Sequence, residues 1–177
     1  MKTVVIYKSK TGFAKSYAEW IGEDLDADVF ESSKITWETL ASYDIIIYGA
    51  GLYATGINGV SLITGNLHKL TNKNVVVFAT GATPSREETT AEIRDRNFTS
   101  EQQEHIKFFY LRGGFDYQKL NLFDKLLMTL LKWKLRRKPV LTTDERGMLK
   151  AYDHPLDATR KKNITDLIAY VKGFTGT

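Results

Sequence analysis

The stretch Ser9-Lys10-Thr11-Gly12-Phe13-Ala14-Lys15 directly follows the apolar run Thr3-Val4-Val5-Ile6-Tyr7. The run predicts a buried strand, and small or apolar residues at helical spacing predict a helix over Phe13–Leu25. The first turn of a helix carries unpaired N–H groups and a partial positive charge. Hydroxyls from Ser9 and Thr11 can add donors, and Gly12 allows close approach. The strand, loop and helix together predict an anion site.

The residue types in this loop limit which anion it suits. The loop does not end in the Gly-Lys-Ser/Thr sequence that a nucleoside triphosphate loop requires. A simpler interpretation is that Ser9 and Thr11 only cap the helix. The loop by itself leaves both interpretations open.

Composition bounds the fold and the chemistry. A chain of 177 residues, 42% hydrophobic and 12% aromatic, predicts one globular domain over 1–177. The absence of cysteine excludes disulfides, thiol catalysis and cysteine-bound iron–sulfur clusters. None of the three histidines is spaced with another to bind a metal. No apolar run reaches the ~18 residues of a membrane span and no signal peptide precedes the first strand, so we expect a cytoplasmic protein.

Strand-like and helix-like segments alternate along the chain. The stronger strands are continuously apolar, as in a parallel sheet that is buried on both faces. This alternation predicts right-handed crossovers and a doubly wound α/β sheet. The connection Glu31–Ser42 is short and has room for at most one helical turn. We expect strands at Thr3–Tyr7, Asp28–Phe30, Asp44–Gly49, Asn74–Ala79 and Lys107–Leu111, and helices at Phe13–Leu25, Val60–Leu70, Ser85–Arg96 and Asp157–Val171.

Three loops should meet at one edge of this sheet. Ser9–Ala14, Gly49–Gly59 and Thr80–Arg86 each follow a strand, and ligands of such sheets bind at the carboxyl ends of the strands. Glycines and small residues in the second and third loops would let a flat ring lie against the backbone, and Tyr53 could stack on it. Glycine-rich loops also make plain tight turns, but three of them at adjacent strand ends favour flavin binding.

A strand followed by Ser/Thr-x-Thr-Gly-x-x resembles the flavodoxin phosphate loop, which holds the phosphate of FMN. Ala14 departs from this pattern, because flavodoxins usually place another hydroxyl residue there. The resemblance implies a five-stranded parallel sheet of order 2-1-3-4-5 and non-covalent FMN. No side chain at the centre looks like a general acid, base or nucleophile, so the flavin would carry the chemistry. The residues that it implies for FMN are Ser9, Lys10, Thr11, Gly12, Phe13 and Ala14 at the phosphate, and Gly51, Leu52, Tyr53, Ala54, Thr80, Gly81 and Ala82 at the ring.

Positive charge is concentrated in the segment 119–138. Seven basic residues and one acidic residue, Asp124, give the segment a net charge of +6, whereas the whole chain carries +4. Within it, Leu120–Lys138 predicts an amphipathic helix with an apolar stripe. Nucleic acid is not an expected partner, because no basic sheet with interleaved aromatics accompanies the segment. The stripe is made of Phe123, Leu126, Leu127, Leu130 and Leu131.

The same segment resembles the insertion near the fifth strand in menaquinone-dependent protoporphyrinogen dehydrogenases, a flavodoxin-like family. Gly113-Gly114-Phe115-Asp116-Tyr117 and Phe123-Asp124-Lys125 carry the resemblance, and the insertion would cover about 113–150. Tyr53-Ala54 stands where that family has Arg-Tyr. The resemblance implies an FMN-dependent oxidoreductase that passes electrons from an organic donor to a quinone. A diffusible electron carrier docking on a redox partner protein is the first alternative, although such carriers tend to be acidic. An FMN-free binding module, which Ala14 would favour, is the second.

Three interpretations of the basic helix remain open at this stage. Its stripe could pack on the sheet edge while its charges are simply solvated. It could lie on an anionic membrane surface, with Trp133 at headgroup level, and give access to a quinone. It could also be a lid over the flavin that recognises an anionic substrate or partner.

Overall fold

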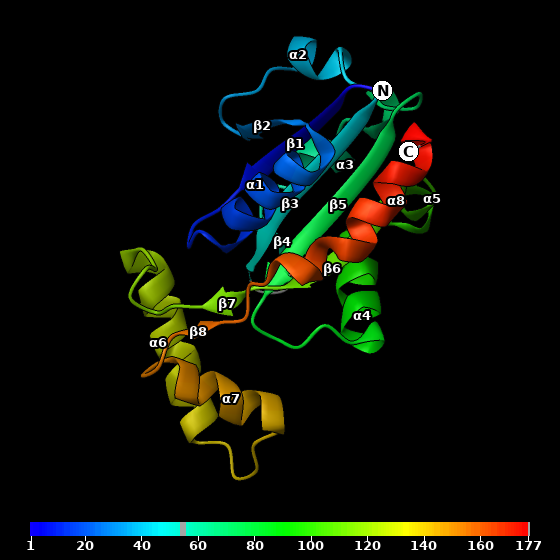
Figure 1. Cartoon of the computed structure of the whole chain (residues 1–177). Coiled ribbons are helices and arrows are strands. Elements are labelled where there is room, and N and C mark those ends of the chain that lie inside the picture. The colour runs from blue at the N-terminus through cyan, green and yellow to red at the C-terminus, as the bar shows by residue number, and fades with distance from the viewer. Residues whose placement is uncertain (54–55, 177) are drawn as a thin grey trace.

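The computed structural model describes residues 1–53 and 56–176, and its centre is a parallel sheet of order β2-β1-β3-β5-β6 (Figure 1). These are the five predicted strands in the predicted order, so the doubly wound α/β fold is confirmed. One further short strand, β4, pairs antiparallel with the end of β3. The strands are β1 Thr3–Lys8, β2 Asp28–Glu31, β3 Ile45–Tyr53, β4 Gly56–Ile57, β5 Asn74–Gly81 and β6 Ile106–Arg112.

The three central strands are buried on both faces because they are almost wholly apolar. Val4–Ile6 of β1, Ile45–Tyr48 of β3 and Val75–Ala79 of β5 are all buried. Gly49 interrupts this pattern for a steric reason, since a side chain there would collide with the ring of Phe78 on the neighbouring strand. Burying two faces along three strands makes this sheet the stable body that positions everything else.

Helices cover the two faces of the sheet. On one face, α1 (Phe13–Leu25) and α8 (Thr165–Thr175) pack with Val5, Ile47 and Phe78. On the other face lie α2 (Trp37–Ala41), α3 (Ser61–Thr64) and α4 (Glu87–Asn97), whose Leu40, Ile63 and Ile93 pack with Val4 and Ile6. The short α5 (Ser100–His105) leads into β6.

Several predicted bounds were wrong, and each has a local cause. The helix expected over Val60–Leu70 stops after α3, at Gly65, and resumes only as a 3₁₀ turn at Leu67–Lys69. The last helix starts later than expected, because residues 156–157 form a strand and Lys161–Ile164 forms a 3₁₀ turn before α8. Gly51, Leu52 and Tyr53 belong to an extension of β3 and not to a loop.

The insertion after β6 is a helical hairpin on a two-stranded base. β7 (Gly114–Phe115) pairs antiparallel with β8 (Leu156–Asp157), and α6 (Leu122–Arg136) and α7 (Thr143–Ala151) lie between them. The Tyr152 hydroxyl after α7 donates to the Met128 carbonyl of α6 at 2.6 Å. Figure 1 shows this hairpin projecting beyond the end of the sheet at which β7 and β8 lie. The sequence predicted α6 but not α7.

Most of the apolar stripe of α6 is exposed to solvent. The exposed fractions are 65% at Phe123, 58% at Leu126 and 55% at Leu130. Packing of this stripe on the sheet edge, the first of the three interpretations, is therefore wrong. The buried side of α6 is formed instead by Asp124 and Leu135.

Tyr17 of α1 joins the two ends of the insertion to the body. Its hydroxyl donates to the Arg112 carbonyl at 2.5 Å and accepts from the Asn163 amide at 2.6 Å. Beside it, the Ala158 N–H donates to the Gly113 carbonyl at 3.0 Å. The chain thus leaves the body after β6 and returns to it before α8 at neighbouring points.

Candidate functional site

The amino end of α1 has the geometry of an anion site. Gly12 precedes the helix with φ of 94°, a left-handed conformation that favours glycine, and no side chain caps this end. The Gly12 N–H donates to Ser9 Oγ at 3.1 Å, which shapes the loop without using the N–H groups of Phe13 and Ala14. A Cβ built on Gly12 would meet no atom within 4 Å, so the space in front of the helix is open. These features fit a phosphate group.

The strand register brings the three predicted regions to one edge of the sheet. Lys8 pairs with Ala50, Gly51 with Thr80, and Gly81 with Arg112, so the carboxyl ends of β1, β3, β5 and β6 are level. The Gly113 N–H then donates to the Gly81 carbonyl at 2.8 Å. Among the predicted residues, those of Ser9–Ala14, Gly51–Tyr53 and Thr80–Ala82 meet at this edge. Ala54 lies outside the described residues.

Several of these residues can offer only their backbone to a ligand. Phe13, Ala14 and Thr80 are buried, and Thr80 packs beside Gly113. The ring of Phe13 faces Gly114, where any side chain would collide with it. A ligand at this edge would therefore meet N–H and C=O groups from these positions, as a flat ring against glycine-rich backbone requires.

The insertion reaches this edge through Asp124 of α6. Lys10 Nζ lies 2.7 Å from Asp124 Oδ2, and the Asp124 side chain is only 3% exposed. The same Lys10 ammonium lies 4.3 Å from the centroid of the Tyr53 ring, in a cation–π contact. Burial and the nearby Asp124 carboxylate raise the pKa of the Tyr53 hydroxyl. Lys10 thus covers one face of the Tyr53 ring, so the predicted stacking of Tyr53 on a flavin could use only the other face of the ring.

The sequence alone did not indicate the Lys10–Asp124 pair. Asp124 occupies the first turn of α6, where its N–H has no acceptor within the helix and donates instead to Asn121 Oδ1 at 2.8 Å. Its second oxygen, Oδ1, has no hydrogen-bond partner among the described residues. One signal was available: Asp124 is the only acidic residue in 119–138.

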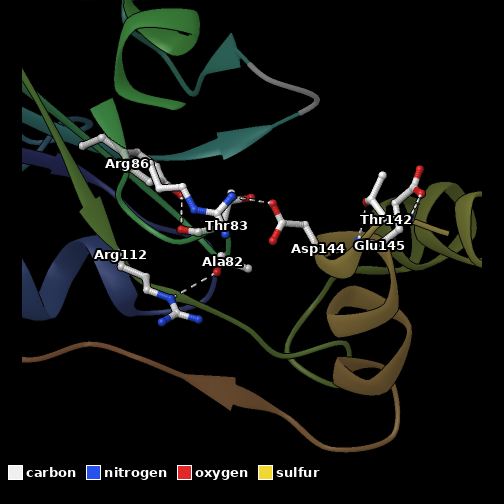
Figure 2. A network of polar contacts seen from close by, with 8 residues as sticks. Ala82, Thr83, Arg86, Arg112, Thr142, Asp144 and Glu145 are labelled. Atoms are coloured by element: carbon white, nitrogen blue, oxygen red, sulfur yellow. Dashed lines mark hydrogen bonds and ion pairs between the residues drawn. The ribbon is translucent and has the colours of Figure 1, made fainter. Parts of the chain in front are cut away.

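A second bridge joins the insertion to the segment after β5 (Figure 2). Arg86 Nη1 lies 3.3 Å from Asp144 Oδ2 at the start of α7, where Thr142 and Glu145 form a capping box. On the sheet side, Arg112 Nε donates to the Ala82 carbonyl at 3.5 Å. The insertion therefore touches both the phosphate-loop region and the Thr80–Arg86 region.

Within residues 1–53 and 56–176, no three His, Asp or Glu side chains are placed to hold a metal ion. Across the same residues, no helix combines the length and apolar character needed to cross a bilayer.

The chain is similar to a known family and to a curated protein. A family model described as a flavodoxin domain matches residues 4–141. A curated relative, an uncharacterized protein of Methanocaldococcus jannaschii, is 27% identical over 129 residues, covering 71% of this chain and 85% of the relative.

Among solved structures, the chain is similar to a flavodoxin, WrbA-like protein from Agrobacterium tumefaciens, with 16% identity and a TM-score of 0.46 over 70% of this chain and 87% of that one. It is also similar to two-electron reduced Megasphaera elsdenii flavodoxin, with 20% identity and a TM-score of 0.44 over 61% of this chain and 84% of that one. Because the family model spans most of the chain, including the candidate anion site and the five parallel strands, the protein belongs to the flavodoxin domain family.

Proposed function

We propose that this protein is an FMN-dependent oxidoreductase that passes electrons from an organic donor to a quinone-like acceptor. The observation that carries the proposal is the uncapped amino end of α1, which opens at the same sheet edge as two glycine-rich strand ends. The residues present fit FMN, since the helix end suits its phosphate and the backbone of Gly51 and Gly81 suits a flat ring. The flavin, when bound, would supply the redox chemistry.

The protein's own residues have binding and positioning roles in this proposal. Ser9, Thr11 and the first N–H groups of α1 would bind the phosphate, and Gly12 would keep the approach open. Gly51, Leu52 and Tyr53 at the end of β3, and Thr80, Gly81 and Ala82 at the end of the neighbouring β5, would contact the ring. Lys10 is held by Asp124 and adds positive charge beside the phosphate loop.

The insertion favours an enzyme over a diffusible carrier. A carrier must expose its flavin edge to changing partners, whereas here α6 and α7 contact the two loop regions that would flank the flavin. The segment 119–138 is also strongly basic, unlike the acidic docking surface expected of a carrier. A protoporphyrinogen-type donor is the finer part of the proposal, and it rests on the resemblance of 113–125 to that family.

The cofactor test is direct. Purified protein should show a flavin absorption spectrum, and chromatography after denaturation should release FMN. FAD as the main species would contradict the proposal, because the proposal places the terminal phosphate of FMN at the amino end of α1. Failure to bind added FMN would favour the FMN-free module instead.

The activity test separates enzyme from carrier. FMN-loaded protein should reduce a soluble quinone such as menadione when a porphyrinogen is supplied, and Gly12→Val, which blocks the phosphate approach, should not. If the loaded protein only exchanges electrons with reductase proteins and turns over none of the small molecules screened, the carrier is the better assignment.

A further inference from the structure

The outer side of α6 is a continuous apolar surface with no cover among the described residues. We call it the docking face and define it as Leu122, Phe123, Leu126, Leu127, Leu130 and Trp133, which lie on one side of the helix at spacings of three and four. Leu122 is 86% exposed and Trp133 is 55% exposed. Large apolar side chains gathered on one exposed side of a helix mark an interaction surface.

The opposite side of α6 is already occupied, so this helix cannot simply rotate to bury the docking face. Tyr152 donates to the Met128 carbonyl, and Lys132 pairs with Asp153 at 3.3 Å. Asp124 is buried against Lys10, at the other end of the helix. These contacts fix which side of α6 faces outward.

Basic residues border the docking face at its carboxyl end. Lys134 and Arg136 are exposed and make no ion pair among the described residues. The Arg137 guanidinium lies 3.3 Å from the centroid of the Trp133 ring. The only acidic residue of 119–138 is the buried Asp124. Neighbouring carboxylates pair with Lys119, Lys132 and Lys138, but none among the described residues pairs with Lys134, Arg136 or Arg137.

We propose that the docking face binds the surface of a membrane that contains anionic lipid. Apolar side chains would enter the boundary between headgroups and acyl chains, Trp133 would lie at headgroup level, and Lys134, Arg136 and Arg137 would contact lipid phosphates. A second copy of the chain is a poorer occupant, because it would bring a second set of basic residues, and no exposed carboxylate of 119–138, into the same contact. This proposal does not depend on the cofactor or on the reaction.

Docking in this way would also orient the molecule. α6 is joined by Asp124 to the phosphate-loop residue Lys10, and the insertion projects from the end of the sheet that bears the candidate site (Figure 1). The candidate site would thus lie next to the lipid surface, where apolar electron acceptors dissolve.

The test is sedimentation of the full chain with phosphatidylcholine vesicles that contain or lack phosphatidylglycerol. Wild-type protein should sediment with the anionic vesicles at low salt and be released at high salt. The double reversal Lys134→Glu/Arg136→Glu should weaken binding by roughly 30-fold or more, since each basic residue near the surface contributes about fivefold. The matched control is Lys34→Glu/Lys162→Glu, which changes the charge equally at two exposed lysines outside the insertion.

A second pair of measurements tests the apolar part. Leu126→Ser/Leu130→Ser should reduce vesicle binding while the melting temperature stays near that of wild type, because both side chains are exposed. Equal losses in the two charge variants, or no wild-type sedimentation at low salt, would overturn the proposal. So would a wild-type dimer in analytical ultracentrifugation that Leu126→Ser/Leu130→Ser converts to monomer without changing vesicle binding.

Discussion

Helices α1 and α6 have the same kind of sequence and opposite surroundings. Both carry apolar residues at three- and four-residue spacing, and both follow a polar loop. In α1 that face, with Tyr17 and Ile21, is fully buried on the sheet, whereas in α6 the face with Phe123, Leu126 and Leu130 is exposed. The pattern therefore predicts that a face is apolar, but it does not predict what that face meets.

Chain connectivity accounts for the difference. α1 connects the neighbouring parallel strands β1 and β2, so it must run back along one face of the sheet and pack on that face. α6 belongs to an insertion whose base, β7 and β8, already stands beyond the sheet. The amino ends differ as well, because α6 is capped by Asn121 and α1 has no side-chain cap. In the two proposals, α1 therefore binds a ligand at its amino end, whereas α6 binds a membrane with its side.

The largest expected effect comes from truncating one apolar residue in each helix. Ile21→Ala should lower the free energy of unfolding by about 2–5 kcal/mol, because it leaves a cavity between α1 and the sheet. Leu126→Ala should change it by less than about 0.5 kcal/mol, as is usual for exposed positions. Urea denaturation of both variants gives the comparison. Similar losses in the two would mean that the α6 face is covered in solution.

The second effect concerns the helix ends. Thr11→Ala should weaken FMN binding by about 1–3 kcal/mol, the range for a hydrogen bond to a charged group. Gly12→Val should weaken it further, by blocking the approach and straining a backbone with φ of 94°. Titration of apoprotein with FMN, followed by flavin fluorescence, measures both. Asn121→Ala, which removes the cap of α6, is the control and should leave the affinity for FMN unchanged.

A related prediction concerns the ring end of the site. Tyr53→Ala should alter the flavin absorption spectrum more than it alters the affinity for the phosphate.

A smaller effect tests the contact between α6 and the phosphate loop. Lys10→Met leaves the buried Asp124 carboxylate without its cation, and we expect a loss of about 1–2 kcal/mol, since Lys10 itself is partly exposed. The loss should appear as faster amide hydrogen exchange in α6 and not in α1. The double variant Lys10→Met/Asp124→Asn should recover part of it. Unchanged exchange in α6 would mean that the pair does not hold the insertion in place.

The smallest effect is a pH dependence of the hairpin. Burial raises the pKa of Tyr152 to about 12, so its neutral hydroxyl is favoured in the folded state. Its stabilising contribution is complete below about pH 10, the ordinary tyrosine pKa, and is lost as the pH rises toward 12. Tyr152→Phe lacks the hydrogen bond to Met128 and should be about 1 kcal/mol less stable at pH 8. Unfolding curves at pH 8 and pH 11 should show this difference shrinking; a constant difference would contradict it.

The sequence predicted those elements whose hydrophobic pattern is compatible with only one kind of secondary structure and burial. Continuous apolar runs such as Ile45–Tyr48 have to be buried on both sides, and the bounds of α1 were predicted as observed, Phe13–Leu25. The break at Gly65 and the helix α7 were missed, since short, mostly polar helices depend on caps such as Thr142 more than on periodicity.

The candidate site also has one part that the sequence predicted and one part that it did not. The convergence of Ser9–Ala14, Gly51–Tyr53 and Thr80–Ala82 follows from strand order, which the pattern determines. The contacts of the site with the insertion do not follow from it. Lys10 and Asp124 are 114 residues apart, and nothing local in the sequence couples them.

The base of the insertion has a consequence for how this fold can change. Gly114 pairs with Asp157 and Phe115 with Leu156, while Tyr17 holds the carbonyl of Arg112 and the amide of Asn163. These contacts hold the two ends of the 40-residue segment 116–155 close together. Because the entropy of loop closure grows only slowly with loop length, the length of this segment has little effect on stability. Segments of very different size could be exchanged at this position with little cost to the sheet. The protein is in this sense a constant flavodoxin-type body that carries a replaceable attachment between β7 and β8.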